Sequence, residues 1–226
     1  LDVIRSTPPN EKMIYGLAVR TSGVDLSDDT IEALIANEVD ILNVTLDAWT
    51  PELYRKLQTP NVGRAVSAEP PASLETVFAR VNRLGELRDQ QRKAKPIVLP
   101  EMTKVKENVH ELDDFFDGWI LRGGAATISG YSHFAGQCDD RSVIRMAPPS
   151  RYGCRRLQSR CLVLADGRVA LCDQDFRGLH CVGSLHEQSL EGIWQGNELT
   201  RVRDAHITGS FDPTPLCAAC DDWHRP

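Results

Sequence analysis

The first 137 residues of this 226-residue chain contain no cysteine, and three other absences narrow the class of protein further. No apolar run approaches the roughly 18 residues that a membrane-spanning helix needs. No charged segment followed by an apolar one, the pattern of a secretory signal, opens the chain. The formal net charge is −6, so the basic surface that binds nucleic acids and anionic membranes is not expected. We therefore expect a cytoplasmic location, with neither a nucleic acid nor a membrane as a partner.

The cysteines that are present all lie in the last part of the chain. Their positions are Cys138, Cys154, Cys161, Cys172, Cys181, Cys217 and Cys220. An odd number of cysteines, without a signal peptide, fits poorly with a secreted disulfide framework. In a reducing compartment, clustered cysteines more often bind a metal or carry out redox chemistry. The alternative is a set of scattered buried thiols that act as small hydrophobic residues.

Residues 13–121 alternate between two kinds of hydrophobic pattern. Short apolar runs predict strands at Met13–Val19, Asp40–Leu46, Pro96–Pro100 and Trp119–Leu121. Helical spacing and capping residues predict helices at 27–37, from Thr50 onward, at Ser73–Arg92 and at Lys106–Phe116. Residues 57–72 carry three prolines and little periodicity, so a loop is expected there. The alternation of strand and helix predicts an α/β fold with a parallel sheet.

The pattern changes between residues 137 and 150, where Pro148-Pro149-Ser150 marks a linker. We place an α/β domain at 1–137 and a small cysteine-rich domain at 138–226. In the second domain, Asp166-Gly167 stands between two apolar runs, at 161–164 and 168–172, which is a strong signal for a β-hairpin. Helices are expected near 189–194 and 197–206.

The cysteine spacing in the second domain predicts a metal site. The pattern runs Cys154-x6-Cys161-x10-Cys172, then Cys181, then Cys217-x2-Cys220. Two cysteines separated by two residues place both sulfurs within one turn, where they can face one ion or cluster. A hairpin that ends at Cys172 and a turn at 217–220 could together bring four thiolates close to one another. Four thiolates suit either tetrahedral zinc or an iron–sulfur cluster, and geometry alone does not separate the two.

Several segments in a fixed order carry a resemblance to a known family. In the second domain they are Cys154, Leu164-Ala165-Asp166-Gly167-Arg168-Val169-Ala170-Leu171-Cys172, Val182-Gly183-Ser184-Leu185, Ser189-Leu190-Glu191-Gly192-Ile193-Trp194 and Pro215-Leu216-Cys217-Ala218-Ala219-Cys220. In the first domain they are Thr21-Ser22-Gly23, Asn43-Val44-Thr45-Leu46-Asp47-Ala48 and Thr50-Pro51-Glu52-Leu53-Tyr54. Together they resemble a radical S-adenosylmethionine enzyme that ends in a SPASM/twitch-like auxiliary iron–sulfur domain. The resemblance covers nearly the whole chain and is most specific in the cysteine-rich domain.

The resemblance implies a fold and a set of ligands. The first domain would be the C-terminal part of a partial parallel (β/α) barrel, and the second would hold one auxiliary [4Fe-4S] cluster. Its ligands would be Cys154, Cys172, Cys217 and Cys220, with Cys161 and Cys181 as less favoured candidates. Full SPASM domains carry further cysteines after the CxxC pair, whereas none follows Cys220 in this sequence, so a single auxiliary cluster is expected.

The family also carries a CxxxCxxC motif whose cluster binds S-adenosylmethionine, and this sequence has none. The chain therefore resembles a C-terminal fragment of such an enzyme, with a natural degenerate protein as the alternative. The parent protein, an oxidoreductase or maturase, would hold S-adenosylmethionine and a second [4Fe-4S] cluster. It would modify a peptide, a protein side chain or a small molecule by 5′-deoxyadenosyl-radical hydrogen abstraction, with electrons from a flavodoxin or ferredoxin. The rival hypothesis is a non-catalytic iron–sulfur or zinc module that binds a partner or relays electrons.

Other polar residues have competing interpretations. Thr45 and Asp47 follow a parallel strand, at the edge where ligands bind in such folds, so the resemblance makes them cofactor contacts, while the alternative is a cap for the next helix. Arg122 and Gly123-Gly124 are expected at another strand end. Cys138 is interpreted as a free thiol, and Cys161 is expected to pack inward with Val163. The residues expected to be solvated are His180, His206, His224, Glu107, Glu111, Asp113, Asp114 and Asp117.

Overall fold

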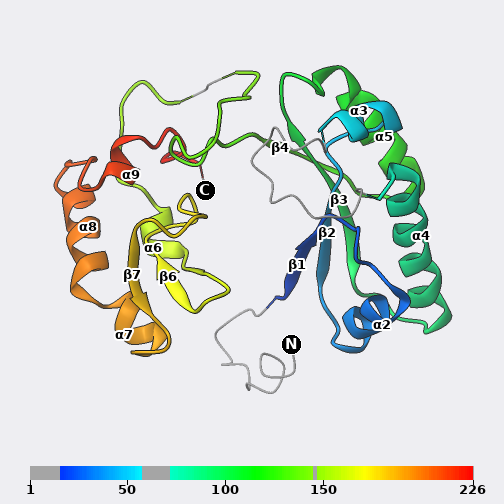
Figure 1. The fold of residues 1–226 in the computed structure, drawn as a ribbon, viewed down its shortest axis with the longest axis horizontal. Helices are drawn as coiled ribbons and strands as arrows, with labels where there is room; N and C mark the ends of the chain where they lie inside the picture. Colours follow the sequence, from blue (N-terminus) through cyan, green and yellow to red (C-terminus); the bar gives the residue numbers. More distant parts are fainter. Residues whose placement is uncertain (1–15, 58–71, 145–146, 226) are drawn as a thin grey trace. The chain divides into compact units, whose positions relative to one another are not determined.

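The computed structural model describes residues 16–57, 72–144 and 147–225. Within these ranges the chain divides into two compact units, and the division falls between Tyr131 and Ser132. We call them the N-terminal unit and the C-terminal unit. The composition of the sequence predicts this division at 137–138. Figure 1 colours the chain from end to end, so that the elements of each unit can be followed.

The N-terminal unit is built on a four-stranded parallel sheet. Its strands are β1 (Ala18–Thr21), β2 (Ile41–Thr45), β3 (Ile97–Lys104) and β4 (Thr127–Gly130). They stand in the order β1-β2-β3-β4, and each neighbouring pair is parallel. Parallel strands in sequential order, joined by helices, are the arrangement found in one segment of a (β/α) barrel. The predicted α/β class with a parallel sheet is therefore confirmed.

Helices cover one face of this sheet (Figure 1). They are α2 (Asp28–Ala36), α3 (Pro51–Leu57), α4 (Leu74–Gln90) and α5 (Leu112–Gly123). Two of them begin at a serine cap, because the hydroxyls of Ser27 and Ser73 accept hydrogen bonds from the N–H groups of Thr30 and Thr76. These two helix starts are as predicted. The predicted loop at 57–72 and the first part of the predicted strand 13–19 lie mostly outside the described residues.

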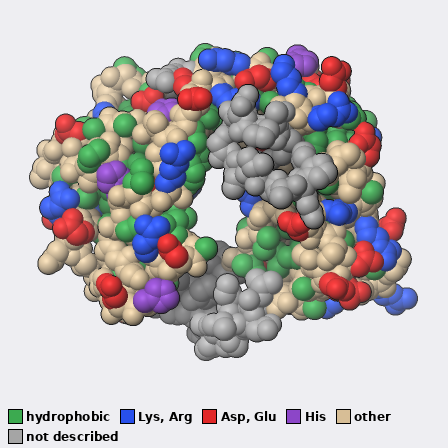
Figure 2. Space-filling view, viewed as in Figure 1, with side chains coloured by type: hydrophobic (Ala, Val, Ile, Leu, Met, Phe, Trp, Pro, Cys, Tyr) green, Lys and Arg blue, Asp and Glu red, His purple; other side chains and the backbone are tan. Residues whose placement is uncertain are grey.

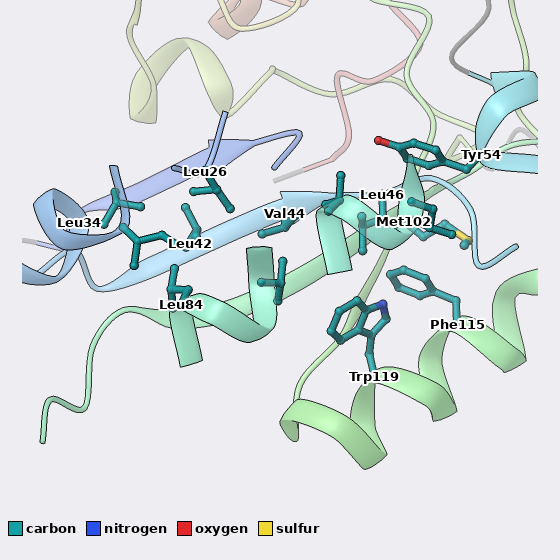
Figure 3. Close-up of a cluster of buried hydrophobic side chains, with 14 of the residues drawn as sticks. Leu26, Leu34, Leu42, Val44, Leu46, Tyr54, Leu84, Met102, Phe115 and Trp119 are labelled. Carbon is teal, nitrogen blue, oxygen red and sulfur yellow. The ribbon is translucent and has the colours of Figure 1, made fainter. Parts of the chain in front are cut away.

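The core of the N-terminal unit lies between the sheet and its helices. Successive strand residues point to opposite faces, and Leu42 and Val44 of β2 are fully buried in the cluster that also holds the helix residues. Figure 3 shows Phe115 and Trp119 pointing from α5 toward Met102 of β3. Fully burying a side chain of the size of Phe115 contributes about 1.5–3 kcal/mol. The unit therefore has an extensive core made of apolar side chains.

One of the predicted strands is wrong. Residues 119–121 lie inside α5, and the fourth strand is β4. Phe115 and Trp119 are four residues apart, so one face of a helix carries both into the core, whereas Leu121 is 87% exposed. The apolar run belongs to a helix with one buried face. A run this short is equally consistent with a buried strand, so the sequence pattern could not distinguish the two.

The end of α5 also corrects the expectation for Arg122 and the two glycines after it. Arg122 lies in the last turn of the helix, with its guanidinium carbon 4.7 Å from the centroid of the Trp49 ring. Gly124 adopts a φ of 73° and its N–H donates to the carbonyl of Ile120, which is the geometry of a helix end. These residues therefore close a helix and do not follow a strand.

Glu111 corrects the expectation of a fully solvated acidic face. It ends the short helix η2 (Val109–Glu111), it is 4% exposed, and its Oε2 accepts the N–H groups of Trp49 at 2.6 Å and Thr50 at 3.2 Å. The Thr50 hydroxyl donates to its other oxygen. Glu111 thus caps the start of α3 from outside that helix. The acidic residues that are exposed, as expected, are Asp113, Asp114 and Asp117.

The C-terminal unit contains a small antiparallel sheet. Its strands, in the order β5-β6-β7, are β5 (Leu162–Val163), β6 (Arg168–Ala170) and β7 (Cys181–Ser184). Gly167, at φ 80°, turns the chain between the first two, so the predicted hairpin is confirmed. The helices are α6 (Arg156–Ser159), α7 (Leu190–Trp194), α8 (Asn197–Ile207) and α9 (Pro215–Ala218). The predictions of helices near 189–194 and 197–206 are also confirmed.

The surface carries charges of both signs. Figure 2 shows acidic and basic side chains intermingled over the described residues on the face in view. Neighbouring charges of opposite sign largely cancel at a distance, so this face does not produce a strong field of one sign. Among the described helices, none combines the length and the apolar character that a membrane span requires.

Candidate metal centre

Four cysteines from separate segments of the C-terminal unit line one pocket. They are Cys154, Cys172, Cys217 and Cys220. Cys154 precedes α6, Cys172 follows β6, and the other two belong to the turn formed by α9. The pocket holds about 340 Å³ of space not filled by protein atoms, part of it open to solvent. The structure thus brings together the four residues that the resemblance implies as ligands.

Hydrogen bonds hold the segment that carries Cys172. The N–H of Leu171 donates to the carbonyl of His180 at 2.8 Å. The fully buried carboxylate of Asp175 accepts the N–H groups of Leu179 at 2.9 Å and His180 at 2.6 Å. These bonds close the chain after β6 into a tight loop. Cys172 is therefore held between a strand and a turn whose backbone N–H groups have hydrogen-bond acceptors.

A capped helical turn holds the CxxC pair. The Thr214 hydroxyl accepts the N–H of Cys217 at 3.2 Å, and Pro215 follows as the first helical residue. The N–H of Cys220 donates to the carbonyl of Cys217 at 3.3 Å. Both cysteines line the pocket, as the spacing predicts for two sulfurs within one turn.

Burial controls the acidity of these thiols. Cys172 is 8% and Cys217 is 7% exposed. Burial raises the pKa of Cys172 to about 12 and that of Cys220 to about 11, and it also raises the pKa of Cys217. Without a bound cation these three side chains are therefore neutral thiols at pH 7. A metal reverses this preference, because thiolates are the ligand form and binding releases their protons.

The spread of the cysteines bears on the kind of metal group that fits. In the ranges that the structure describes, no three Cys, His, Asp or Glu side chains are arranged to hold a single metal ion. One tetrahedral zinc would need four sulfurs at about 2.3 Å from a common point. An iron–sulfur cluster takes its thiolates on different iron atoms, so it accommodates sulfurs distributed around a pocket. The four cysteines around one pocket are the donor set that such a cluster takes.

Two arginines that were not predicted as site residues, Arg151 and Arg156, also line the pocket. Arg156 is buried, and its Nη1 donates to both carboxylate oxygens of Asp173, at 2.8 and 2.7 Å. Its Nε donates to the carbonyl of Arg225 at 3.2 Å. The positive charge of Arg156 is thus neutralised within the unit.

His206 corrects the expectation of a surface histidine. It is 6% exposed and lines the pocket from the face of α8 that also carries Leu199 and Val202. Its Nδ1 accepts the N–H of Cys154 at 3.3 Å, so the proton of the neutral ring is on Nε2. Burial and then the charge of Arg151 lower the pKa of His206, so the ring is neutral at pH 7. Positions 199, 202 and 206 share one helical face, and this spacing was the signal that could have revealed the burial.

The remaining cysteines do not line this pocket. Cys161 and Cys181 are exposed, and Cys138 is half-buried. The expectation that Cys161 packs inward with Val163 is wrong, since Val163 is 41% exposed. The physical reason is that β5 is a two-residue strand at the edge of its sheet and leaves this side chain in solvent.

The strand-end residues of the N-terminal unit make structural contacts. Asp47, at φ 56°, accepts the N–H of Thr103 on its Oδ1 at 3.0 Å. Thr45 lies in register with Glu101 of β3, whose buried carboxylate accepts two hydrogen bonds from Arg20 at 2.9 and 2.6 Å. The role of Thr45 and Asp47 as cofactor contacts stays a prediction. The ion pair beside them was missed because its partners are 81 residues apart.

Comparison with known proteins adds a family match in the region of the pocket. Residues 154–221 match the family model of SPASM, an iron-sulfur cluster-binding domain, and this stretch includes all four pocket cysteines. An uncharacterized protein of Treponema pallidum (strain Nichols) is 31% identical over 131 residues, which are 57% of this chain and 34% of that protein. The chain therefore spans about a third of the length of this relative.

Two solved structures are similar to the chain at low sequence identity. BtrN in complex with AdoMet and 2-DOIA is 16% identical, with a TM-score of 0.45, over 88% of this chain and 57% of that one. A histidine-tagged anSMEcpe with bound AdoMet is 14% identical, with a TM-score of 0.43, over 91% of this chain and 60% of that one. The chain spans less than two thirds of either structure.

Proposed function

We propose that the C-terminal unit binds one [4Fe-4S] cluster, with Cys154, Cys172, Cys217 and Cys220 as its ligands. The observation that carries this proposal is that four cysteines from three segments line a single pocket. The match of residues 154–221 to an iron-sulfur cluster-binding domain supports it. When bound, such a cluster supplies one-electron transfer.

The residues around the thiols would hold and shield the cluster. Leu157, Leu216 and Trp223 are buried and line the pocket, so they restrict the access of water to the ligands. The Arg156–Asp173 ion pair joins the first residue of α6 to the residue after Cys172. Restricted solvent and fixed neighbours are the features by which a protein sets the potential of such a group.

We further propose that this chain is part of a radical S-adenosylmethionine protein in which the cluster of the C-terminal unit is auxiliary. The ordered motifs of both units support this assignment, together with the SPASM match. The substrate of the parent protein would be a peptide, a protein side chain or a small molecule, and a flavodoxin or ferredoxin would donate electrons. S-adenosylmethionine would contact Thr45 and Asp47, and its own cluster would need a CxxxCxxC motif that this sequence lacks.

Anaerobic reconstitution of the chain with iron and sulfide tests the cluster proposal. We expect about four iron and four sulfide per chain, with the broad visible absorption of iron–thiolate clusters. Stoichiometric zinc without sulfide, under the same reducing conditions, would contradict it.

Cleavage of S-adenosylmethionine tests the second proposal. The reconstituted chain alone is expected to form no 5′-deoxyadenosine, because a cluster with four thiolate ligands offers no open iron to the cofactor. Product above a protein-free control would contradict this. A CxxxCxxC encoded upstream of Leu1 in the same reading frame would support the assignment to a longer radical enzyme.

A further inference from the structure

Arg151 brings an unpaired positive charge to the cysteine pocket. Its Nη2 donates to the carbonyl of Cys217 at 2.8 Å, and its guanidinium carbon lies 5.6 and 5.9 Å from the ring centroids of Phe211 and Trp223. Its Nε is buried and meets no hydrogen-bond acceptor among the described residues. Within this part of the chain no carboxylate forms an ion pair with it, whereas Arg156 on the same pocket is fully paired.

A cation in this position would be stabilised by a negative group in the same pocket. A partly buried charge without one is costly, and an N–H group that is buried without an acceptor adds to the cost. Arg151 lines the same pocket as the four cysteines and donates to the carbonyl of Cys217, and the cysteine thiols become negative when they bind a metal.

The charge of the metal-bound pocket matches this need. Four thiolates outweigh the positive charge of a [4Fe-4S] core, and reduction makes the pocket more negative by one electron. Net charge and hydrogen bonds to the sulfurs are among the factors that set the potential of such clusters. A nearby cation stabilises the reduced state more than the oxidised state, because the attraction grows with the negative charge.

We propose that Arg151 is the counter-charge of the cluster and raises its reduction potential, so that the cluster accepts an electron more readily. The inference rests on the proposed function, since it requires a cluster at these four cysteines. Arg151 is a positioning residue in this assignment, because it acts through the thiolates and the field around them.

The test is a potentiometric titration of the whole reconstituted chain, with the reduced cluster followed by electron paramagnetic resonance. In Arg151→Gln we expect the ratio of reduced to oxidised cluster, at a fixed potential, to fall about tenfold, which is about 59 mV for one electron. Arg151→Lys keeps the charge and should show a much smaller shift. Iron and sulfide content are measured in each variant.

Arg203→Gln is the matched control. Arg203 also donates to two carbonyls, those of Leu157 at 2.8 Å and Trp194 at 2.6 Å, and its guanidinium lies 4.0 Å from the Trp194 ring centroid. It does not line the cysteine pocket. Its replacement removes the same kinds of contact in the same unit, so we expect an unchanged potential.

The outcomes separate this inference from the proposed function. A parent chain that takes up no iron contradicts the proposed function. An Arg151→Gln chain that loads fully and keeps its potential overturns the counter-charge role while cluster binding stands. If Arg151→Gln does not load, loading of Arg151→Lys supports the role of the charge. If neither Arg151→Gln nor Arg151→Lys takes up iron while Arg203→Gln does, the guanidinium of Arg151 has a structural role only, and the inference is overturned.

Discussion

The two units close their cores by different means. In the N-terminal unit, apolar side chains from the sheet and the helices form an extensive cluster that needs no ligand. In the C-terminal unit the core is smaller, and Cys172 and Cys217 are members of it, with Cys154 and Cys220 packed against it. The cysteines proposed to bind the cluster thus also contribute to the hydrophobic core of this unit. Metal loading and folding should therefore be coupled in the C-terminal unit and independent in the N-terminal unit.

Removing one pocket cysteine should show this coupling most strongly. Cys172→Ala, Cys217→Ala and Cys220→Ala are each expected to abolish intact [4Fe-4S] loading and to leave the tail after Asp212 sensitive to protease. The reason is that each change removes a metal bond around which the neighbouring segments fold. Iron and sulfide analysis, with limited proteolysis, measures both effects.

The other cysteines supply the controls for that experiment. Cys138→Ala and Cys161→Ala should load iron normally, because neither residue lines the pocket, and should lose about 1 kcal/mol of packing energy at most. Cys154→Ala should fail to load. Full loading in Cys154→Ala, together with loss in Cys161→Ala, would show that the wrong member of this pair was assigned.

Removing the metal from the intact protein is expected to have the next largest effect. An iron chelator, applied anaerobically, should make the C-terminal unit sensitive to protease while fragments of the N-terminal unit persist. Mass spectrometry of the fragments, before and after chelation, locates the cuts. Equal resistance of both units to protease after complete iron loss would show that the apolar side chains of the C-terminal core are enough to keep that unit folded.

A cavity in the core of the N-terminal unit should lower the stability of that unit without lowering the iron content of the chain. Phe115→Ala is expected to lower the free energy of unfolding by about 3–5 kcal/mol, because Phe115 is fully buried. Urea denaturation followed by circular dichroism measures the change, and iron content should stay at the parent value. Phe116→Ala is the matched control, since Phe116 is 41% exposed and should cost far less. Loss of iron in Phe115→Ala would contradict the prediction that metal loading is independent of the N-terminal unit.

The smallest expected effect concerns a close contact of helix α5. A Cβ at Gly118 would overlap the ring of Trp49, whereas a Cβ at Gly85 of α4 would meet open space. Gly118→Ala should therefore destabilise the N-terminal unit by about 1–2 kcal/mol, the cost of overpacking less the gain in helix propensity. Gly85→Ala should stabilise it by up to about 1 kcal/mol. Thermal denaturation of the two variants compares them, and equal shifts would show that the Trp49 ring moves aside freely.

The features that were predicted well are those encoded by neighbouring residues. The serine caps at Ser27 and Ser73, the Asp166-Gly167 turn and the CxxC turn each depend on a few adjacent side chains, and each is present in the structure. The grouping of Cys154 with the CxxC pair came from the order of motifs. It was not contained in any single local pattern.

The features that were missed depend on contacts between distant segments. Glu111 is buried because it accepts the N–H of Thr50, 61 residues earlier, at the start of α3, and an acidic residue in isolation gives no sign of this. Residues 119–121 are apolar enough for a strand, and only the docking of α5 decides which of them are buried. The role proposed for Arg151 depends on the lack of an ion pair with any carboxylate of the described residues, which a sequence cannot display.

The wide separation of the pocket cysteines has a consequence for the synthesis of the chain. Cys154 leaves the ribosome 66 residues before Cys220, since 220 − 154 = 66. At about 5–20 residues per second this interval is roughly 3–13 s. During it Cys154 and Cys172 have no CxxC partner and are open to oxidation, which would remove them as ligands. Insertion of the proposed cluster would therefore follow the emergence of the second pair, and oxidising conditions during translation should lower the fraction of chains that can be loaded.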